Sequence, residues 1–511
     1  MIAVSDAWKD IQQRFLLPET YIEIDCAITE EGAQEAAIGS GANEEVFSNV
    51  DSVLDNDENI TKYATNELNI WSLDGTVSVL PALAPYADAG YVSANEGDSS
   101  VTLTFPTIRE AAVAGITIKW SDTFGEYAPI FTVSAKNGST TVAETTITDN
   151  TSATSVVSMN LENYDSITVT VHTWSLPNRR RRIEKVSIGH VLTLTKSDIL
   201  SFSHEQHGDL LSGEIPKYSI EFTLDNTDGR WNPNNPTGME RYLSERQKLT
   251  VRYGLNVNGL IEWIKAGTFY LSEWDAPSNG LEARFVARDS FEYLLDVEMW
   301  AAVGNQLSGL INDVTRGLLP TGSSVVYDAN LRNYFYGYTP SYADGKVDTA
   351  AEIVQKCANA AGGILRYDRD GVLYVEQLNR TLSDYRIPLS LSYSYPQITL
   401  SKPLKEVSVD YGGTSSYKLE NISREGESQT LTNEYIKNAT NAAAVADWVR
   451  GILKNRKIVS GEFRADPRLD LYDIVVVESK YGALTPVVIT DIKYTFNGSF
   501  RGSYTGRVLE V

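Results

Sequence analysis

The pattern of apolar and polar positions changes several times along the chain. Residues 21–28 alternate between apolar and polar side chains, which predicts a strand with one buried face. A segment rich in glycine, alanine and glutamate follows at 29–45, and we interpret it as a linker.

From about Phe47 to His190, short runs of strand-forming residues are separated by polar turns. The clearest of these runs are Val101–Phe105, Gly115–Trp120, Ile130–Ala135 and Ser166–Trp174. Their spacing predicts an all-β sandwich or jelly roll.

Beyond residue 192 the pattern predicts further strands, with a few helices among them. A short helix is expected after an Asp289-Ser290 cap. Helical spacing recurs at 307–314 and again at 350–361, where Asp348 is the expected N-cap. Hairpins are expected at Asp370-Gly371 and at Asn497-Gly498. Between these two hairpins, a helix that ends near Leu453 interrupts a second set of strands. The predicted fold class is mainly β, a multidomain and β-rich α+β chain.

Composition and charge restrict the function classes. The chain has 511 residues and a net charge of −23, so a basic nucleic-acid-binding surface is not expected as its main function. Two cysteines, Cys26 and Cys357, cannot form a disulfide framework and are expected to be buried thiols. The N-terminal residues lack the pattern of a secretion signal, and no apolar run is long enough to span a membrane. We therefore expect neither export by a cleaved signal nor membrane insertion.

No catalytic or metal motif stands out in the sequence. The histidines of His204–His207 point to opposite faces of a strand, which argues against a shared metal. The loop around Gly229 fails as a calcium loop because Leu224 and Asn235 occupy ligand positions. The run Arg179–Arg182 is interpreted as surface charge. Among 67 acidic residues, a glycosidase pair is neither singled out nor excluded. We predict no catalytic residues, no metal and no cofactor.

Three separated segments suggest a family for part of the chain. They are "KYATNELNIWSLDGT", "GITIKWSDTFGEYAPIFTV" and "YDSITVTVHTWSLPNRRRRIEKVSIG". They resemble an accessory jelly-roll module of tail proteins from phages of Gram-positive hosts. Such modules look like galactose-binding-like carbohydrate-binding domains, and the resemblance covers about 45–192.

The flanking segments resemble tail-tip and baseplate hub proteins of phages. The segment from "ILSFSHEQHGDLL" to "AGTFYLSEW" is similar to the first β-domain of such hubs, and "GEFRADPRLDLYDIVVVES" with "VVITDIKYTFNGSFRGSYTGR" is similar to the second. The resemblance implies two β-barrel-like domains side by side, in a homotrimer whose ring continues the tail tube. The implied organisation is an N-terminal segment and first hub strand at 1–44, the inserted module at 45–192, hub domain I at 193–300, a mixed α/β domain at 301–400 and hub domain II at 401–511.

This resemblance also implies location and partners. The protein is expected in the tail tip or baseplate of a virion assembled in the host cytoplasm, in contact with other tail proteins. Host cell-wall polysaccharide is a possible partner of the module. DNA would pass through the lumen without specific binding, and an acidic lumen wall would favour this. The sequence ends at Val511 directly after the last hub strands, which argues against an appended lytic domain and against an enzyme.

Sugar recognition commonly combines aromatic platforms with a few polar groups. The candidates in the module are Trp71, Tyr86, Trp120, Tyr127 and Trp174, with Arg179 and Glu126 as polar partners. Trp120 shares strand parity with Ile116 and Ile118, which favours a core position for it. The module could also serve only as a contact with neighbouring baseplate proteins.

Two alternatives remain open for the whole chain. One is a lectin-like adhesin without a tube role, for which a secretion signal would be expected. The other is a cell-wall glycoside hydrolase with an accessory module, for which a clear catalytic pair would be expected.

Overall fold

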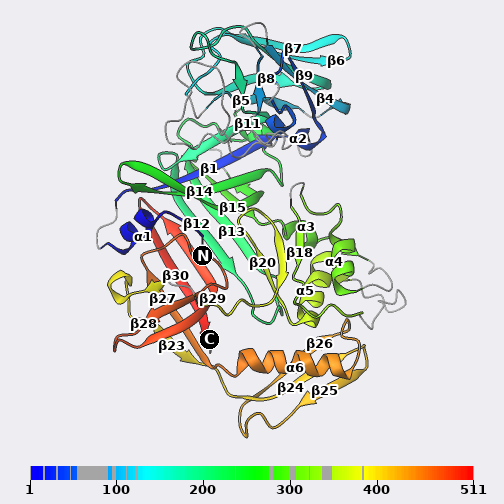
Figure 1. Ribbon diagram of the computed structural model, residues 1–511, viewed down its shortest axis with the longest axis vertical. Helices are drawn as coiled ribbons and strands as arrows, with labels where there is room; N and C mark the ends of the chain where they lie inside the picture. The colour runs from blue at the N-terminus through cyan, green and yellow to red at the C-terminus, as the bar shows by residue number, and fades with distance from the viewer. Residues whose placement is uncertain are drawn as a thin grey trace. The chain divides into compact units, whose positions relative to one another are not determined.

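The computed structural model divides the chain into two compact units (Figure 1). The first unit comprises Met1–Ile24, Leu194–Pro236 and Lys248–Val511, and the second comprises Asp25–Thr193 and Thr237–Gln247. The structure describes residues 2–14, 18–29, 33–45, 48–54, 90–94, 99–110, 112–121, 125–235, 238–275, 280–299, 306–320, 323–335, 348–382 and 385–509.

A long, mostly antiparallel sheet dominates the first unit. In strand order it contains β23 (Gln397–Leu400), β27 (Lys457–Phe463), β30 (Phe500–Val508), β29 (Leu484–Phe496), β12 (Ile199–His207), β13 (Lys217–Asp225), β16 (Glu282–Arg288), β15 (Leu260–Asp275), β14 (Lys248–Val257) and the first part of β1 (Thr20–Thr29). To one side of this order, β28 (Ile474–Glu478) pairs with β29, and β22 (Arg386–Ile387) pairs with β28. Two regions distant in sequence therefore share one sheet.

The junction between these regions is the pairing of β12 with β29. Phe202 faces Phe496, and His204 faces Tyr494 in this antiparallel register. Alternate residues of both strands are buried, because a pleated strand sends every second side chain into the core. The buried side chains form an aromatic core, in which the rings of Tyr253 and Phe500 lie 4.7 Å apart at their centroids.

The segment between these regions is mixed, as its pattern predicts. Its elements are α3 (Glu292–Leu295), β17 (Glu298–Met299), α4 (Leu307–Thr315), β18 (Val325–Tyr327), β19 (Asp348–Thr349), α5 (Ala350–Ala361), β20 (Ile364–Tyr367), β21 (Leu373–Glu376) and the 3-10 turn η4 (Leu389–Leu391). The hairpin of β20 and β21 turns at Gly371, whose φ is +89°, and confirms the expected turn.

Two expected helix caps are wrong by one or two residues. The N-cap of α5 is Thr349, which forms a capping box with Glu352, while Asp348 forms ion pairs with Lys356 instead. The N-cap position of α3 is Phe291, and Asp289 accepts a hydrogen bond from its backbone N–H. The sequence pattern alone did not identify which residue occupies the N-cap position of each helix.

The remaining elements of the first unit are helical or belong to a small sheet. They are α1 (Asp6–Gln13), α6 (Ala439–Leu453), β24 (Leu404–Tyr411), β25 (Ser415–Leu419) and β26 (Glu427–Asn433). The small sheet has the order β25-β24-β26, and α6 packs on it through its buried face, which includes Val445 and Val449 (Figure 1).

The second unit is a β-sandwich. One sheet has the order β2 (Ile38–Ala42), β4 (Ser99–Arg109), β9 (Tyr164–Val171), β6 (Phe131–Asn137) and β7 (Thr140–Ile147). The other contains the end of β1, β11 (Lys185–Thr195), β5 (Val113–Lys119) and β8 (Thr154–Leu161). Short elements complete it: α2 (Ala33–Ala36), η1 (Asp51–Leu54), β3 (Tyr91–Val92), β10 (Arg182–Ile183) and η2 (Glu240–Tyr242). Strand side chains of both sheets, such as Phe131 and Ile116, share one buried core.

The interpretation of 29–45 as a linker is wrong. Within this segment Ile38–Ala42 forms β2, which pairs with β4 from Ile38↔Thr104 to Ala42↔Ser100. The small residues fit a strand that a neighbouring loop approaches closely, since a Cβ on Gly39 would lie 2.7 Å from a side-chain atom of Val50. The mainly β, multidomain fold class is confirmed. Both cysteines are buried free thiols, as expected.

Candidate functional site

Two predicted sugar-binding residues meet at a buried carboxylate in the second unit. The carboxylate of Glu126, 1% exposed, accepts a hydrogen bond from the indole Nε1 of Trp174 at 2.7 Å. The guanidinium of Arg179 lies 3.1 Å from the same carboxylate, and that of Arg182 lies at 3.9 Å. A buried carboxylate requires such partners because burial removes it from water.

The other aromatic candidates belong to the core against which Trp174 packs. Trp120 is fully buried, and its ring contacts those of Phe131 and Trp174 at centroid distances of 4.8 and 6.2 Å. Its indole N–H donates to the hydroxyl of Ser155. Tyr127 is half-buried against the same core. Trp120 thus occupies the core position that its strand parity indicates.

The structure therefore brings five predicted residues together and leaves two unplaced. Trp120, Glu126, Tyr127, Trp174 and Arg179 form one cluster, whereas Trp71 and Tyr86 lie outside the described residues. Most polar groups of this cluster form hydrogen bonds or ion pairs with one another and do not face solvent. Trp174 and Arg179 are partly exposed members of this cluster.

The arginine run is not surface charge throughout. The side chains of Arg181 and Arg182 are 7% and 2% exposed. Arg181 donates to the backbone carbonyls of Val171 and His172 at 2.6 and 2.9 Å. The earlier interpretation fails because guanidinium groups can be buried when carbonyls and carboxylates accept their N–H donors.

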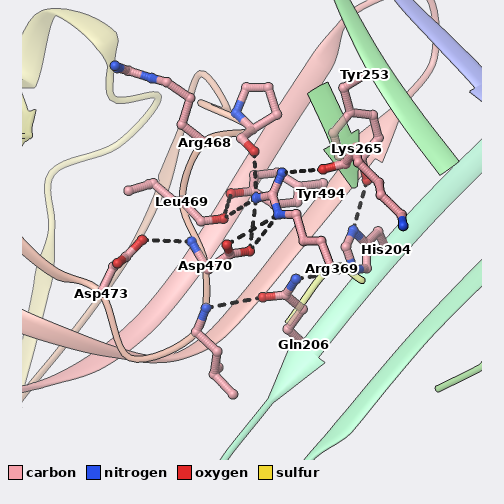
Figure 2. Close-up of polar contacts among 12 residues, drawn as sticks. His204, Gln206, Tyr253, Lys265, Arg369, Arg468, Leu469, Asp470, Asp473 and Tyr494 are labelled. Atoms are coloured by element: carbon pink, nitrogen blue, oxygen red, sulfur yellow. Dashed lines mark hydrogen bonds and ion pairs between the residues drawn. The ribbon is translucent and has the colours of Figure 1, made fainter. Parts of the chain in front are cut away.

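A second polar cluster lies in the first unit, where three sequence regions meet (Figure 2). The guanidinium of Arg369, which lies in the turn between β20 and β21, is 8% exposed. It binds the carboxylate of Asp470 at 2.9 Å. Its remaining donors bond the backbone carbonyls of Lys265, Pro467 and Leu469 at 2.8 to 3.1 Å. One side chain thus joins the mixed segment to β15 and to the loop before β28.

Buried tyrosines and a histidine extend this cluster (Figure 2). The hydroxyl of Tyr494 donates within the same loop, where the carbonyls of Asp466 and Leu469 both lie at 3.0 Å. His204 Nδ1 lies 2.8 Å from the hydroxyl of Tyr253. Burial lowers the pKa of His204 to about 3, so this imidazole is neutral at physiological pH.

His207 lies apart from His204, as alternation along a strand requires. His207 is partly exposed, and its Nδ1 lies 2.5 Å from a carboxylate oxygen of Asp491. Among the described residues, no group of His, Cys, Asp and Glu side chains is arranged to hold a metal ion. None of the described helices is long and apolar enough to cross a membrane.

Asp289 is a third buried polar group of the first unit. Its carboxylate accepts hydrogen bonds from the backbone N–H groups of Tyr218 at 2.7 Å and Phe291 at 2.8 Å. Burial nevertheless raises the pKa of Asp289 from 3.8 to about 7. The sequence indicated this residue only as a helix cap.

A pocket of about 320 Å³ opens beside α1 in the first unit. Its walls include the apolar side chains of Trp8, Tyr393 and Phe500 and the guanidinium of Arg464. Arg464 donates to the backbone carbonyl of Gln12. The volume is at the lower limit of small-molecule sites.

Comparison with known proteins yields structural neighbours but no sequence family. No family model matches the chain, and no curated protein matches it. The 43 kDa tail protein of prophage MuSo2 from Shewanella oneidensis is 14% identical, with a TM-score of 0.44 over 62% of this chain and 94% of that one. A tail protein from Neisseria meningitidis MC58 is 12% identical, with a TM-score of 0.45 over 62% and 94%. Prophage tail protein gp18 from Listeria monocytogenes EGD-e is 11% identical, with a TM-score of 0.40 over 62% and 91%.

Proposed function

We propose that this chain is a structural hub protein of the tail tip or baseplate of a tailed phage or phage-tail-like particle. Three copies form a ring that continues the tail tube, and other tail proteins dock on it. The particle is assembled in the host cytoplasm, and the chain acts without catalysis or a cofactor.

One observation carries this proposal: strands of 193–300 and 401–511 form one continuous sheet. The pairing of β12 with β29 joins the two regions over six residue pairs, from Phe202↔Phe496 to His207↔Asp491. A hub of two β-domains side by side needs such a junction to act as a rigid wall. The buried Arg369 cluster supports the same role, because it joins the mixed segment to both regions.

The solvent side of this junction bears on the passage of DNA. Glu205 of β12 pairs with Lys493 of β29, and Glu221 of β13 pairs with Arg284 of β16. Charges neutralised in cross-strand pairs present no continuous basic track for phosphates. The acidic lumen stays a prediction, because the arrangement of the three copies in the ring determines which surface of each copy faces the lumen.

We propose that the module at 45–192 makes peripheral contacts with host glycans or with neighbouring baseplate proteins. Trp174 and Arg179, both only partly exposed, are its described candidates, and Trp71 and Tyr86 remain candidates from the sequence. Titration of the full chain with host cell-wall polysaccharide should give heat that Trp174→Ala and Arg179→Ala abolish. Absence of heat with the native chain would remove the glycan role and leave the baseplate contact.

Electron microscopy of the purified chain tests the ring directly. We expect particles with threefold symmetry and a central hole, with a mass in solution of three chains. A turbidity assay on host cell walls tests the absence of catalysis, and clearing by the pure protein would contradict it.

A further inference from the structure

Three described hairpin turns of the chain contain the dipeptide Asn-Gly. They are Asn137-Gly138 between β6 and β7, Asn258-Gly259 between β14 and β15, and Asn497-Gly498 between β29 and β30. In a fourth pair, at 279–280, the asparagine lies outside the described residues. The first and third turns share the sequence Asn-Gly-Ser, at 137–139 and 497–499. A large difference in reactivity between these two turns in the folded chain would therefore come from their structure.

An Asn-Gly pair can react within its own backbone. The glycine nitrogen loses its proton and attacks Cγ of the asparagine side chain. A new C–N bond closes a succinimide ring, the C–N bond to the side-chain nitrogen breaks, and ammonia leaves. Water then opens the ring at either of its two carbonyl carbons, which gives aspartate or isoaspartate, and no oxidant or reductant is needed. The chain itself holds the two reacting atoms close together, and glycine has no Cβ to hinder their approach.

The Asn497-Gly498 turn leaves both reacting groups free. Both residues are exposed, and no described group forms a hydrogen bond with the carboxamide of Asn497 or with the N–H of Gly498. Within the turn, the N–H of Asn497 donates to the carbonyl of Ser499 over a long 3.4 Å. A Cβ on Gly498 would meet nothing within 4 Å, so the turn has room to close the ring.

The Asn137-Gly138 turn has the same sequence but is held at both reacting groups. The N–H of Gly138 donates to the carboxylate of Asp165 at 2.7 Å, and the carboxamide of Asn137 donates to the backbone carbonyl of Asn163 at 2.9 Å. A carboxylate beside this N–H opposes the loss of its proton, because two negative charges would then face each other. The hydrogen bond to Asn163 must also break before Cγ can turn toward the glycine nitrogen. Both contacts therefore slow ring closure at Asn137.

The Asn258-Gly259 turn lies between these two cases. The N–H of Gly259 donates to the side-chain oxygen of Asn256 at 2.9 Å. This acceptor is neutral, so it opposes deprotonation less than a carboxylate does. The three turns thus form a series in which the glycine N–H has a charged acceptor, a neutral acceptor, or no acceptor among the described residues.

We propose that Asn497 is a site of spontaneous conversion to aspartate and isoaspartate in the folded protein. The product adds a negative charge directly before Gly498, Ser499 and Phe500, which line the pocket beside α1 together with Arg464. Isoaspartate also lengthens the backbone of the turn by one atom. The preceding residue, Phe496, pairs with β12, so the modification changes the chain at one end of the β12–β29 junction.

Peptide mapping of the full chain tests this proposal. The folded chain and the chain in urea are incubated at pH 8.5, and mass spectrometry then measures the aspartate and isoaspartate forms of each turn. In the folded chain we expect Asn497 to convert about ten times faster than Asn137 or more, with Asn258 between them. Both products should form at Asn497. In urea the two Asn-Gly-Ser turns should convert at similar rates, because the structural differences are then lost.

Two variants test the cause of the difference. Asp165→Ala removes the acceptor of the Gly138 N–H, so conversion of Asn137 should become several times faster while that of Asn497 stays unchanged. Asn497→Gln is the matched control at the reactive turn, since its longer side chain would have to close a larger ring, and we expect no conversion there. Circular dichroism verifies that both variants are folded.

The contrary results are equally distinct. Equal rates at Asn497 and Asn137 in the folded native chain would overturn the proposal without any variant. Conversion of Asn497 to aspartate alone would exclude the succinimide ring. An unchanged rate at Asn137 in folded Asp165→Ala would contradict the protection by the carboxylate on which the comparison of the turns depends.

Discussion

Arg369 joins three sequence regions of the first unit. It is almost fully buried, its carboxylate partner is Asp470, and its other donors bond backbone carbonyls of two other regions. We expect Arg369→Met to reduce the free energy of unfolding by about 3–5 kcal/mol, because the change leaves Asp470 and these carbonyls without their donor. Denaturant titration followed by tryptophan fluorescence measures this loss.

Arg386 provides the matched control for this prediction. It also pairs with a carboxylate, that of Glu478 at 2.8 Å, but its side chain is 47% exposed. Arg386→Met should cost less than about 1 kcal/mol, since water screens such a pair. Equal losses in the two variants would contradict the assigned role of Arg369.

Asp289 makes stability depend on pH in a predictable direction. Its folded-state pKa of about 7 lies above its ordinary value of 3.8, so the protonated carboxyl stabilises the fold. Below about pH 4 this contribution to the free energy of unfolding is complete. It is lost as the pH rises through 7, and the total loss is about 4 kcal/mol.

Asp289→Asn should remove that loss. The amide cannot ionise, but its NH₂ group meets a backbone N–H donor, so the variant starts less stable at low pH. We expect its unfolding midpoint in urea to change less between pH 5 and 8.5 than that of the native chain. Parallel curves for the two proteins would refute a buried carboxyl with a raised pKa.

For single residues, the sequence pattern predicted the position of a side chain on its strand better than it predicted the groups that the side chain contacts. The parity of Trp120 correctly favoured the core, because alternation along a strand is a local property. The burial of Arg181 and the junction at Arg369 could not be predicted, because their acceptors come from loops distant in sequence. No local pattern marks an arginine whose partners are backbone carbonyls.

Among the elements, β5 depends on a glycine at an irregular point of its pairing with β8. Gly115 has a φ of +140°, and a Cβ there would lie 1.9 Å from the carbonyl oxygen of Val157. We expect Gly115→Ala to destabilise the sandwich by about 2–4 kcal/mol, from an unfavourable φ and a clash with backbone. Thermal unfolding followed by circular dichroism measures the change.

Gly138 separates these two causes. Its φ is also positive, at +57°, but a Cβ there would meet nothing within 4 Å. Gly138→Ala should therefore cost only about 1 kcal/mol, the price of the φ alone. If the two variants lose the same stability, the close approach of Val157 to β5 is incorrect.

Strands and hairpins were the part of the structure that sequence patterns predicted best. Alternation identified the strands of both units, and the Asp370-Gly371 and Asn497-Gly498 turns follow from local chemistry. The pattern failed at 29–45, where small residues indicated a linker but form β2 beside β4. Such patterns also could not predict the pairing of β12 with β29, because strand order depends on contacts between segments that are distant in sequence.

For the whole molecule, one sheet joins 193–300 to 401–511, and the proposed ring brings together three copies that each carry a net charge of −23. Raising the salt concentration should strengthen the association of the three copies, since screening weakens the repulsion between chains of like net charge. Sedimentation at 0.05 and 0.5 M salt checks this, and weaker association at high salt would indicate a contact held by opposite charges.

The most direct test of the central claim is single-particle electron microscopy of the purified chain, with its mass in solution measured on the same sample. We predict a threefold ring with a central hole and a mass of three chains. A particle that is monomeric at every concentration, or an assembly without a central hole, would contradict the hub function.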